Sequence, residues 1–478
     1  MAAESSTEVE TEVSPIAEKA KKRGFFSRFF LRKPGSLEET EKRDYNHICK
    51  VRDKERKDFY LTQAQLAILH HHAEEFSATP SLSLSGGAAL KSNGAIVFGS
   101  LKELPQDVYA SVGRMKVPEK ELEEHLDIMA NILSFADKVR PRRKFLTKAQ
   151  HAVQSDSSFD REGFNNRHLP RMYVAPDELF KQIKVREVKK MFKICDYLGD
   201  GGYGNVVGAK VLGKQYPPKV KFVAIKYQDV GTSQSAKTLV AHEASFLKWA
   251  DHPSICKFYD SIQVQSEVWI VTEMLEGGTL KEAAAASSQW SESSIAYVAA
   301  KMLAGISYLH ENQLAHRDLK NLNVMFTVQA EVKLIDFGLC VDLCNGPTVA
   351  MIGSPFWMAP EMIRGVPHSF PVDIWSFMVC MLELANRRPP DCKNVRRALF
   401  KHAVHGMGPD SALEKPDQWT DTFKAFLASG FHMNPAERST AADLLKHPFL
   451  EKINSRENMC KMLSGIFLDK SVVAGGIL

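Results

Sequence analysis

The pattern of hydrophobic and polar residues changes near residue 190, and the two parts of the chain predict different architectures. Before that point, residues 37–76 and 117–139 combine dense charge with apolar residues at helical spacing. Pro118 suits the first turn of the second helix, because a residue there needs no N–H donor. The apolar residues of that block recur once per helical turn and share one face: Leu122, Leu126, Met129, Leu133 and Ala136.

After residue 190 the pattern switches to short β-branched and aromatic runs, followed by long amphipathic stretches. The runs KFVAIKY (221–227) and EVWIVTEM (267–274) predict strands. From residue 292, stretches such as ESSIAYVAAKMLAGISYLH predict helices. This order favours an α+β fold in which a small, strand-rich lobe precedes a helical lobe, with the functional residues in the cleft between the lobes.

Composition divides the chain further. Residues 78–105 are small and Ser/Gly-rich, which is typical of a loop, and residues 154–170 have the composition of a linker. We expect the helix at 117–139 to serve packing; because residues 37–150 carry no chemical motif, an autoinhibitory role is the alternative. The predicted parts are a disordered tail (1–36), a helical region (37–150), a linker (151–189), a two-lobed domain (190–451) and a C-terminal tail (452–478).

Charge and cysteine content narrow the class of protein. The 478 residues carry a net charge of only +5, so nucleic acid is not expected as the main partner. The 8 cysteines are scattered without metal-ligand spacing or disulfide density, which favours free thiols in a reducing compartment. We find no apolar leader and no uncharged run of about 18 residues, and we therefore expect a cytoplasmic protein.

Residues 19–33 form a separate basic and aromatic segment. They hold seven Lys or Arg residues and no acid, interleaved with Phe25, Phe26, Phe29, Phe30 and Leu31. This mixture suits an anionic membrane surface, to which basic side chains are attracted while aromatic rings bury in the interface. A nuclear address and a solvated tail are the two alternatives.

Two segments of the small lobe have the composition of a phosphate-binding site. LGDGGYGNVVGAK places Gly199, Gly201 and Gly204 where missing Cβ atoms let backbone N–H groups approach phosphates, although hairpin turns also gather glycines. Lys226 ends the strand FVAIK and could pair with phosphate oxygens; its alternative is a surface lysine. Glu243 lies in a helical pattern, where a buried pair would hold Lys226 in place, or else on a solvated face.

The strongest signal is HRDLKNLN, residues 316–323. Phosphoryl transfer needs an in-line hydroxyl, neutralised charge and fixed Mg²⁺. Asp318 would accept or orient the hydroxyl proton, Lys320 would face the γ-phosphoryl group, and Asn323 would offer an oxygen to Mg²⁺. Thirteen residues later, LIDFG supplies Asp336 as the main Mg²⁺ ligand. Each motif alone could be a polar turn, but all of them in this order indicate phosphoryl transfer from ATP.

Taken together, these motifs resemble the eukaryotic serine/threonine protein kinases. GSPFWMAPE, DIWSF and NVRRALFKHAVHGMGP look like the sterile-twenty superfamily, and the PAK group most of all. The resemblance implies a two-lobed kinase fold over 190–451, ATP and Mg²⁺ as cofactors, and a protein substrate. It further implies Val206 and Ala224 in the nucleotide pocket, Thr272 as gatekeeper, the backbones of Glu273 and Leu275 toward adenine, Ser354 near the catalytic loop, and a structural Glu361–Arg438 pair.

The chain departs from that family at several positions. Ala350 stands where relatives carry an activating threonine, which leaves Arg317 to a structural role or to a phosphate on Thr348. Met378 replaces a glycine and is expected to crowd the large lobe locally. We find no GTPase-binding motif and do not expect direct binding of a small GTPase. A pseudokinase scaffold, or a lipid or small-molecule kinase, is the alternative to a protein kinase.

Overall fold

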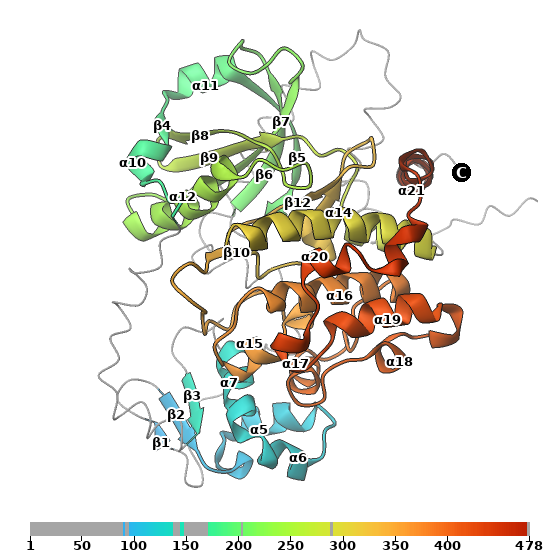
Figure 1. Ribbon diagram of the computed structural model, residues 1–478. Coiled ribbons are helices and arrows are strands. Elements are labelled where there is room, and N and C mark those ends of the chain that lie inside the picture. The colour runs from blue at the N-terminus through green and yellow to red at the C-terminus, as the bar shows by residue number, and fades with distance from the viewer. Residues whose placement is uncertain are drawn as a thin grey trace, which may run out of the picture.

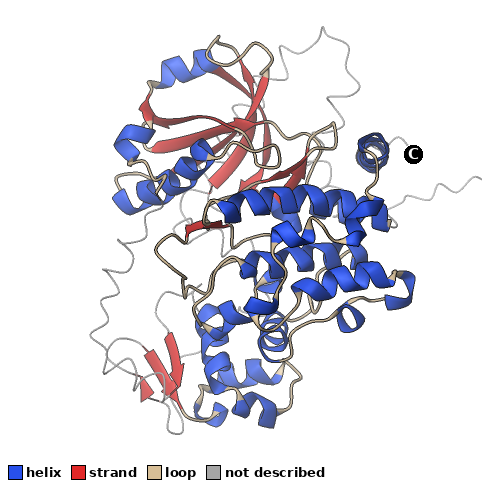
Figure 2. Cartoon of the chain, viewed as in Figure 1, coloured by secondary structure: helices blue, strands red, loops and turns tan. Residues whose placement is uncertain are grey.

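A computed structural model of the chain describes residues 89–90, 95–136, 144–147, 171–201, 204–286 and 290–475. The basic segment 19–33 and the predicted helical block 37–76 lie outside the described residues. Figures 1 and 2 show two lobes, one rich in strands and one helical, and a third group of elements below the helical lobe. The expected order of a strand-rich lobe before a helical lobe is therefore confirmed.

The small lobe is built on a twisted six-stranded sheet. Its strands follow the order β4-β8-β9-β7-β6-β5, and only the β4–β8 pair is parallel. Helix α12 begins after Ser233, whose side chain accepts a hydrogen bond from the N–H of Ala236 and so caps the helix. The elements are α10 (Pro176–Leu179), β4 (Lys181–Gln182), α11 (Val185–Met191), β5 (Phe192–Gly201), β6 (Gly204–Val211), β7 (Phe222–Asp229), α12 (Gln234–Trp249), β8 (Phe258–Val264) and β9 (Glu267–Glu273).

The large lobe is mainly helical, and its long helix α16 is buried along almost its whole length. Two short antiparallel pairs, β10 with β13 and β11 with β12, lie where the lobes meet. Its elements are α13 (Leu280–Ala286), α14 (Glu292–Glu311), β10 (Leu314–Ala315), η4 (Asn321–Asn323), β11 (Val324–Phe326), β12 (Val332–Leu334), β13 (Val341–Asp342), η5 (Pro355–Trp357), α15 (Pro360–Arg364), α16 (Pro371–Asn386), α17 (Val395–Val404), α18 (Pro409–Ala412), η6 (Pro416–Gln418), α19 (Asp421–Gly430), η7 (Pro435–Glu437), α20 (Ala441–Leu444), η8 (Pro448–Lys452) and α21 (Arg456–Gly475).

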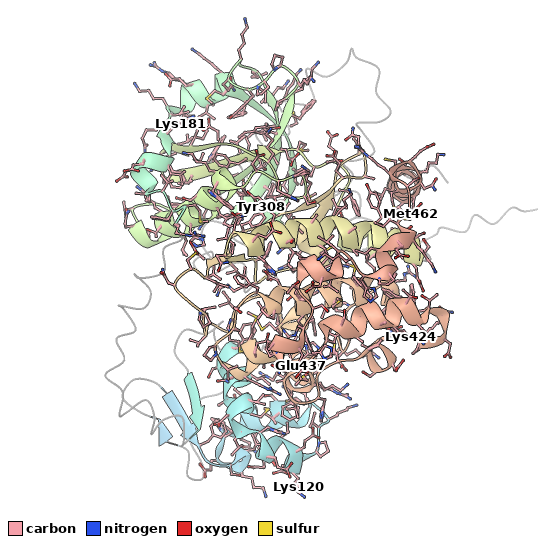
Figure 3. All side chains as sticks on the ribbon, viewed as in Figure 1. Lys120, Lys181, Tyr308, Lys424, Glu437 and Met462 are labelled. Atoms are coloured by element: carbon pink, nitrogen blue, oxygen red, sulfur yellow. The ribbon has the colours of Figure 1, made fainter. Side chains whose placement is uncertain are left out.

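The two lobes meet at Tyr308 of α14, which is labelled between them in Figure 3. Its ring stacks on His252 with centroids 5.0 Å apart, and it lies 5.6 Å from the ring of Trp249 at the end of α12. Its hydroxyl accepts a hydrogen bond of 3.2 Å from the N–H of Asp251. This contact anchors the end of α12 to the large lobe.

The described residues 89–90, 95–136 and 144–147 form a small unit that packs against the large lobe, and we refer to it as the extension. It contains β1 (Ala89–Leu90), β2 (Ala95–Phe98), η2 (Leu101–Glu103), α5 (Gln106–Gly113), α6 (Glu119–Glu124), α7 (Leu126–Ala136) and β3 (Lys144–Thr147). Apolar residues of both partners form one buried cluster, from the extension Phe98, Leu101, Leu104, Val112, Met115, Leu122, Met129, Ala130, Ile132 and Leu133, and from the large lobe Phe356, Met358, Ile363, Val395, Ala398, Leu399, Phe400 and Ala403. The extension thus shares a hydrophobic core with η5, α15 and α17, beside which it lies in Figure 1.

The helical character expected within 117–139 is confirmed, but the helix is divided at His125, whose φ of −127° and ψ of 43° end α6 before α7 begins; Pro118 directly precedes α6. Two other predictions about these segments were wrong. Residues 78–105 are not all loop, because Ala95–Phe98 pairs with Lys144–Thr147 as parallel strands. The part of the predicted linker from 171 to 189 is folded, since β4 extends the sheet of the small lobe beside β8.

Met378 is accommodated by a glycine from the neighbouring helix. The side chain is fully buried in α16, where the sequence led us to expect local crowding. Gly430 of α19 faces it, and a Cβ atom at that position would overlap the Met378 side chain. The missing side chain at 430 therefore provides the space that the large residue at 378 occupies.

An ion pair lies inside the large lobe between Glu361 of α15 and Arg438. The guanidinium donates two hydrogen bonds to the carboxylate, at 2.6 and 2.8 Å, and both side chains are almost completely buried. Arg438 also donates to the carbonyl groups of Pro371 and His432, and it lies 5.3 Å from the ring of Trp375. The pair joins α15 to the start of α16.

We predict that Glu361→Gln lowers the free energy of unfolding by about 3–5 kcal/mol, because it leaves a buried guanidinium without its counter-charge. Urea denaturation followed by tryptophan fluorescence measures this. Glu414→Gln is the matched control, since its pair with Arg388 has a similar distance of 2.7 Å but is exposed to solvent. Equal midpoints for the two variants would contradict the prediction.

Candidate active site

The loop after β10 is shaped by Asp373, a fully buried carboxylate of α16. Its two oxygens accept hydrogen bonds of 2.8 Å from the backbone N–H groups of His316 and Arg317, and one accepts 3.0 Å from Nε2 of His310. Burial raises the pKa of Asp373, but these donors outweigh burial and hold the pKa below its ordinary value. Asp373 therefore acts as a fixed anionic support for the loop 316–323.

The backbone is strained at both ends of this site. Arg317 has a φ of 62° and Asp336 a φ of 64°, conformations that residues with a side chain rarely adopt. Gly353 lies against the same loop with a φ of 105°, and a Cβ atom there would be 2.5 Å from the carbonyl oxygen of Arg317. Such strain persists only where surrounding contacts impose it, and it gathers at functional sites.

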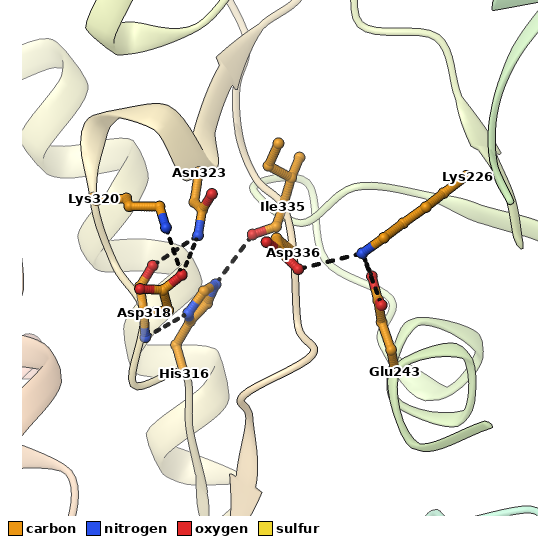
Figure 4. Close-up of polar contacts among 8 residues, drawn as sticks. All are labelled: Lys226, Glu243, His316, Asp318, Lys320, Asn323, Ile335 and Asp336. Carbon is orange, nitrogen blue, oxygen red and sulfur yellow. Dashed lines mark hydrogen bonds and ion pairs between the residues drawn. The ribbon is translucent and has the colours of Figure 1, made fainter. Parts of the chain in front are cut away.

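The carboxylate of Asp318 is the centre of a small polar network (Figure 4). Oδ2 accepts hydrogen bonds from Nζ of Lys320 at 2.8 Å and from Nδ2 of Asn323 at 2.9 Å. Oδ1 accepts one of 2.7 Å from the hydroxyl of Ser354, which in turn accepts from Lys320. The side chain of Asp318 is thus fixed from three directions, as a group that must receive a proton at one place requires.

His316 holds this network against the next strand. Its Nδ1 accepts from the N–H of Asp318 at 3.3 Å, so Nδ1 carries no proton and Nε2 donates to the carbonyl oxygen of Ile335 at 3.2 Å. The ring also lies 5.0 Å from that of Phe337. The histidine consequently ties the loop of Asp318 to the segment that carries Asp336 (Figure 4).

On the small-lobe side, Lys226 of β7 reaches two of the predicted acids, Glu243 and Asp336. Its Nζ lies 2.7 and 2.8 Å from the carboxylate oxygens of Glu243 and 3.4 Å from Oδ1 of Asp336. Burial alone would lower the pKa of Lys226, but Asp336 and Glu243 outweigh it and raise that pKa. Burial likewise opposes ionisation of Asp336, yet Lys226 and the other nearby basic groups keep the pKa of Asp336 below its ordinary value.

The position of α12, which carries Glu243, depends on an aromatic stack. Phe337 follows Asp336 directly, is fully buried, and stacks on Phe246 of α12 with ring centroids 4.7 Å apart. Phe246 lies one helical turn after Glu243, so a shift of α12 would break the stack and the ion pair together. Phe246 was not identified from the sequence as a partner of this segment.

Asn323 and Asp336 fit a hard cation. The amide nitrogen of Asn323 donates two hydrogen bonds of 2.9 Å to Asp318, one to its backbone carbonyl oxygen and one to Oδ2. The side-chain amide oxygen of Asn323 is therefore left for another partner. Asp336 is ionised at neutral pH because its pKa is lowered. Within the described residues, no three His, Cys, Asp or Glu side chains gather into a metal site. An Mg²⁺ ion held here would need phosphate oxygens to complete its coordination.

The predicted nucleotide-binding residues come together on β5, β6, β7 and β9. Gly199 and Gly201 lie on β5, paired with Val206 and Gly204 of β6. A Cβ atom at Gly204 would lie 2.6 Å from the carbonyl oxygen of Tyr227, so β6 can pass β7 there only with glycine. Ala224 of β7 is paired with Thr272 of β9. Glu273 ends β9, and Leu275 lies in the segment after it.

Glu273 also has a structural task that the sequence did not indicate. Its carboxylate accepts a hydrogen bond of 2.7 Å from the N–H of Lys257 and lies 3.0 Å from Nζ of Lys333. The same applies to Asp373, which was noticed only as part of DIWSF and received no role. The backbone partners of Asp373 are 56 and 57 residues away in sequence. A carboxylate that binds such distant backbone groups gives no local sequence signal.

Hydrogen bonds to residues outside it hold the loop between Asp336 and Ser354 in place. Thr348 exchanges two backbone hydrogen bonds with His368, of 2.8 and 3.0 Å, and its hydroxyl accepts from the N–H of Ala350. Nε of Arg317 donates to the carbonyl oxygen of Leu339 at 2.9 Å, which agrees with the structural alternative for this arginine. Modification of Thr348 remains a prediction.

The comparison with known families gives the identity of the domain. Residues 192–450 match the model of the protein kinase domain, which is more than half of the chain. This chain belongs to the protein kinase family. The two lobes of the kinase are those described above, and the residues of the expected kinase motifs meet between them.

The known relatives of this kinase are described as serine/threonine-protein kinases. It is 39% identical over 382 residues to the probable serine/threonine-protein kinase mkcB of Dictyostelium discoideum, covering 80% of this chain and 50% of mkcB. It is 42% identical over 283 residues to mkcC of the same organism, covering 59% of this chain and 31% of mkcC. The serine/threonine-protein kinase shk1/pak1 of Schizosaccharomyces pombe is 32% identical over 272 residues, covering 56% of this chain and 40% of shk1/pak1.

The predicted resemblance to sterile-twenty and PAK kinases is thus confirmed, and the chain spans about half the length of mkcB. None of the helices among the described residues is long and apolar enough to cross a membrane.

Proposed function

We propose that this chain is an active serine/threonine protein kinase that transfers the γ-phosphate of ATP to Ser or Thr hydroxyls of proteins. The observation that supports this most is the complete polar network. Asp318 binds Lys320 and Asn323 in the large lobe, while Lys226 pairs with Glu243 in the small lobe and also reaches Asp336 of the large lobe. A pseudokinase scaffold would tolerate loss of these contacts, and none is lost here.

Each residue has one task in the proposed reaction. Asp318 orients the substrate hydroxyl and receives its proton as the oxygen bonds to the γ-phosphorus and the bond from that phosphorus to the bridging oxygen of ADP breaks. Lys320, fixed by Ser354, neutralises charge on the phosphoryl group in transit, and Lys226 pairs with the α- and β-phosphates. Asn323 and Asp336 would hold Mg²⁺, which shields the phosphate charges when bound.

The protein substrate would lie near Ser354, because Oγ of this residue bonds to both Asp318 and Lys320. The residues that follow, Pro355–Trp357, form η5 beside the catalytic loop. A lipid or small-molecule kinase would have no use for such a surface beside the acceptor group.

We predict that the purified chain, with labelled ATP, Mg²⁺ and a basic protein, transfers phosphate, and that Asp318→Asn loses at least about a hundredfold in kcat because the proton acceptor is removed. Chelation of Mg²⁺ should abolish transfer by the wild type. Binding of ATP by Asp318→Asn, followed by fluorescence, is the control for folding. A wild type that binds ATP without any transfer would favour the scaffold.

We further propose that the extension restrains the kinase. It covers Phe356 and Met358, which follow Ser354 by two and four residues, and it packs on α15 and α17. Polar contacts support the packing: Nδ2 of Asn131 donates to the carbonyl oxygen of Arg364 at 2.9 Å, and His405 lies 2.6 Å from Glu121. A protein substrate that reached Ser354 over Phe356 and Met358 would meet the extension.

We predict that Met129→Asp in the full chain raises kcat/KM for a protein substrate several-fold, since a carboxylate at a fully buried position detaches the extension. Lys120→Ala is the control, because Lys120 is exposed on α6 and points away from the kinase in Figure 3. Two results would contradict the prediction: lower activity, or unchanged activity with lower thermal stability. Either would mean that the extension only stabilises the fold.

Residues 19–33 would bring the kinase to an anionic membrane. We predict that the full chain sediments with vesicles containing phosphatidylserine but not with phosphatidylcholine alone, and that binding weakens as salt is raised. Replacing Lys21, Lys22 and Arg23 with Glu should abolish sedimentation. Retained binding after this charge reversal would exclude an electrostatic membrane role for the segment and leave the nuclear address or solvated tail.

A further inference from the structure

Residues 171–174 bond to the large lobe at one end and to α12 of the small lobe at the other, and we refer to them as the strap. The strap precedes α10 and belongs to the segment that the sequence assigned to a linker. Met172, Tyr173 and Val174 are partly buried against the main hydrophobic core. The strap is therefore a packed element of the domain.

The first residue of the strap, Arg171, bonds to the loop that follows Asp336. Its backbone N–H and its Nε both donate to Oδ2 of Asp342, at 2.8 and 3.1 Å, and a terminal guanidinium nitrogen donates to the carbonyl oxygen of Asn312 at 2.9 Å. The side chain of Asp342 is 5% exposed and that of Arg171 is 59% exposed. A nearly buried carboxylate thus receives its charged partner from the strap.

Asp342 lies at a junction of the active site. In β13 it pairs with Leu314 of β10, and β10 leads directly into the loop that carries Asp318. Leu343 adds a hydrogen bond of 2.8 Å from its N–H to the carbonyl oxygen of Gln313. Because β13 starts only five residues after Asp336, its position also limits where Asp336 can lie. Fixing Asp342 therefore fixes both segments of the catalytic network.

The last residue of the strap bonds to α12. The N–H of Val174 donates to Oγ of Ser245 at 2.9 Å, and this hydroxyl donates back to the carbonyl oxygen of Val174 at 3.4 Å. Ser245 is 1% exposed and stands two residues after Glu243, next to Phe246, which stacks on Phe337. The strap thus holds the helix that positions Glu243 against Lys226.

From these contacts we infer that Arg171 is a positioning residue for phosphoryl transfer, through which the strap couples α12 to the β10–β13 pair. The inference rests on the proposed kinase activity. Within the described part of the chain, the strap touches the small-lobe helix at one end and the loop after Asp336 at the other, three residues apart. Loosening Arg171 should therefore disturb both regions, although neither Asp318 nor Lys226 contacts it.

The test compares Arg171→Ala with Arg456→Ala in the full chain. Arg456 of α21 is a matched control. Its side chain is 55% exposed, donates a hydrogen bond of 2.8 Å to the carbonyl oxygen of Gln329 and lies 3.4 Å from a carboxylate oxygen of Glu331, and these partners belong to the turn between β11 and β12 rather than to α12 or the β10–β13 pair. We expect Arg171→Ala to lower kcat on the order of tenfold and to raise KM for ATP, as loss of a charge-assisted hydrogen bond would. Arg171→Lys should lie between, because lysine keeps the charge without the planar donors.

Hydrogen exchange provides a readout that needs no catalysis. Arg171→Ala should speed amide exchange in 338–346 and also in 241–247, at the other end of the strap, and Ser245→Ala should do the same in both regions. The two substitutions should be non-additive in kcat, since each breaks the same connection. Arg456→Ala should change neither region.

Two results would overturn the inference. One is a kcat for Arg171→Ala within twofold of the wild type with unchanged exchange, which would make the pair an ordinary surface salt bridge. The other is faster exchange near Asp342 without any change in 241–247, which would show that the strap does not connect the two regions. A wild type without transfer activity would instead refute the proposed function, and the exchange experiment would still decide the role of the strap.

Discussion

The active site depends on one buried carboxylate, Asp373. Its negative charge is stable in the interior only because two backbone amides and His310 donate to it. Those amides belong to His316 and Arg317, so the bonds hold Arg317 in its strained backbone conformation and direct Asp318 toward the cleft. Charge burial, backbone strain and the direction of the acceptor group are consequently parts of one arrangement, and none of them could persist alone.

Local sequence predicted the residues of the site far better than the contacts between its elements. Lys226, Glu243, Asp318, Asn323 and Asp336 were identified from short motifs, because phosphate and metal chemistry restricts residue type and spacing. Direct contacts join Lys226 to Glu243 and Asp336, and Asp318 to Asn323. The supports of these residues were missed. Asp373, Phe246 and Ser245 act on partners remote in the chain, and a buried acid, phenylalanine or serine in a helix has no distinctive neighbours in sequence.

The same limit explains the errors in the first part of the chain. The apolar period across 117–139 is real, and Leu122, Met129 and Leu133 are buried, but periodicity does not register the break at His125. Residues 95–98 form a strand because a partner at 144–147 is available, which composition cannot reveal. Met378 is a further example, because its large side chain fits only where the partner residue on α19, Gly430, has none, and this pairing is visible only in the packed structure.

The hydrophobic cluster shared by the extension and the large lobe has a consequence for the handling of this protein. Phe356, Ile363, Leu399 and other apolar side chains of the large lobe are shielded from water by the extension. A chain shortened to the kinase domain would expose them as one contiguous apolar patch, and such patches promote self-association. The extension therefore also acts as an internal solubility factor, and purification of the isolated domain would require polar substitutions on α15 and α17.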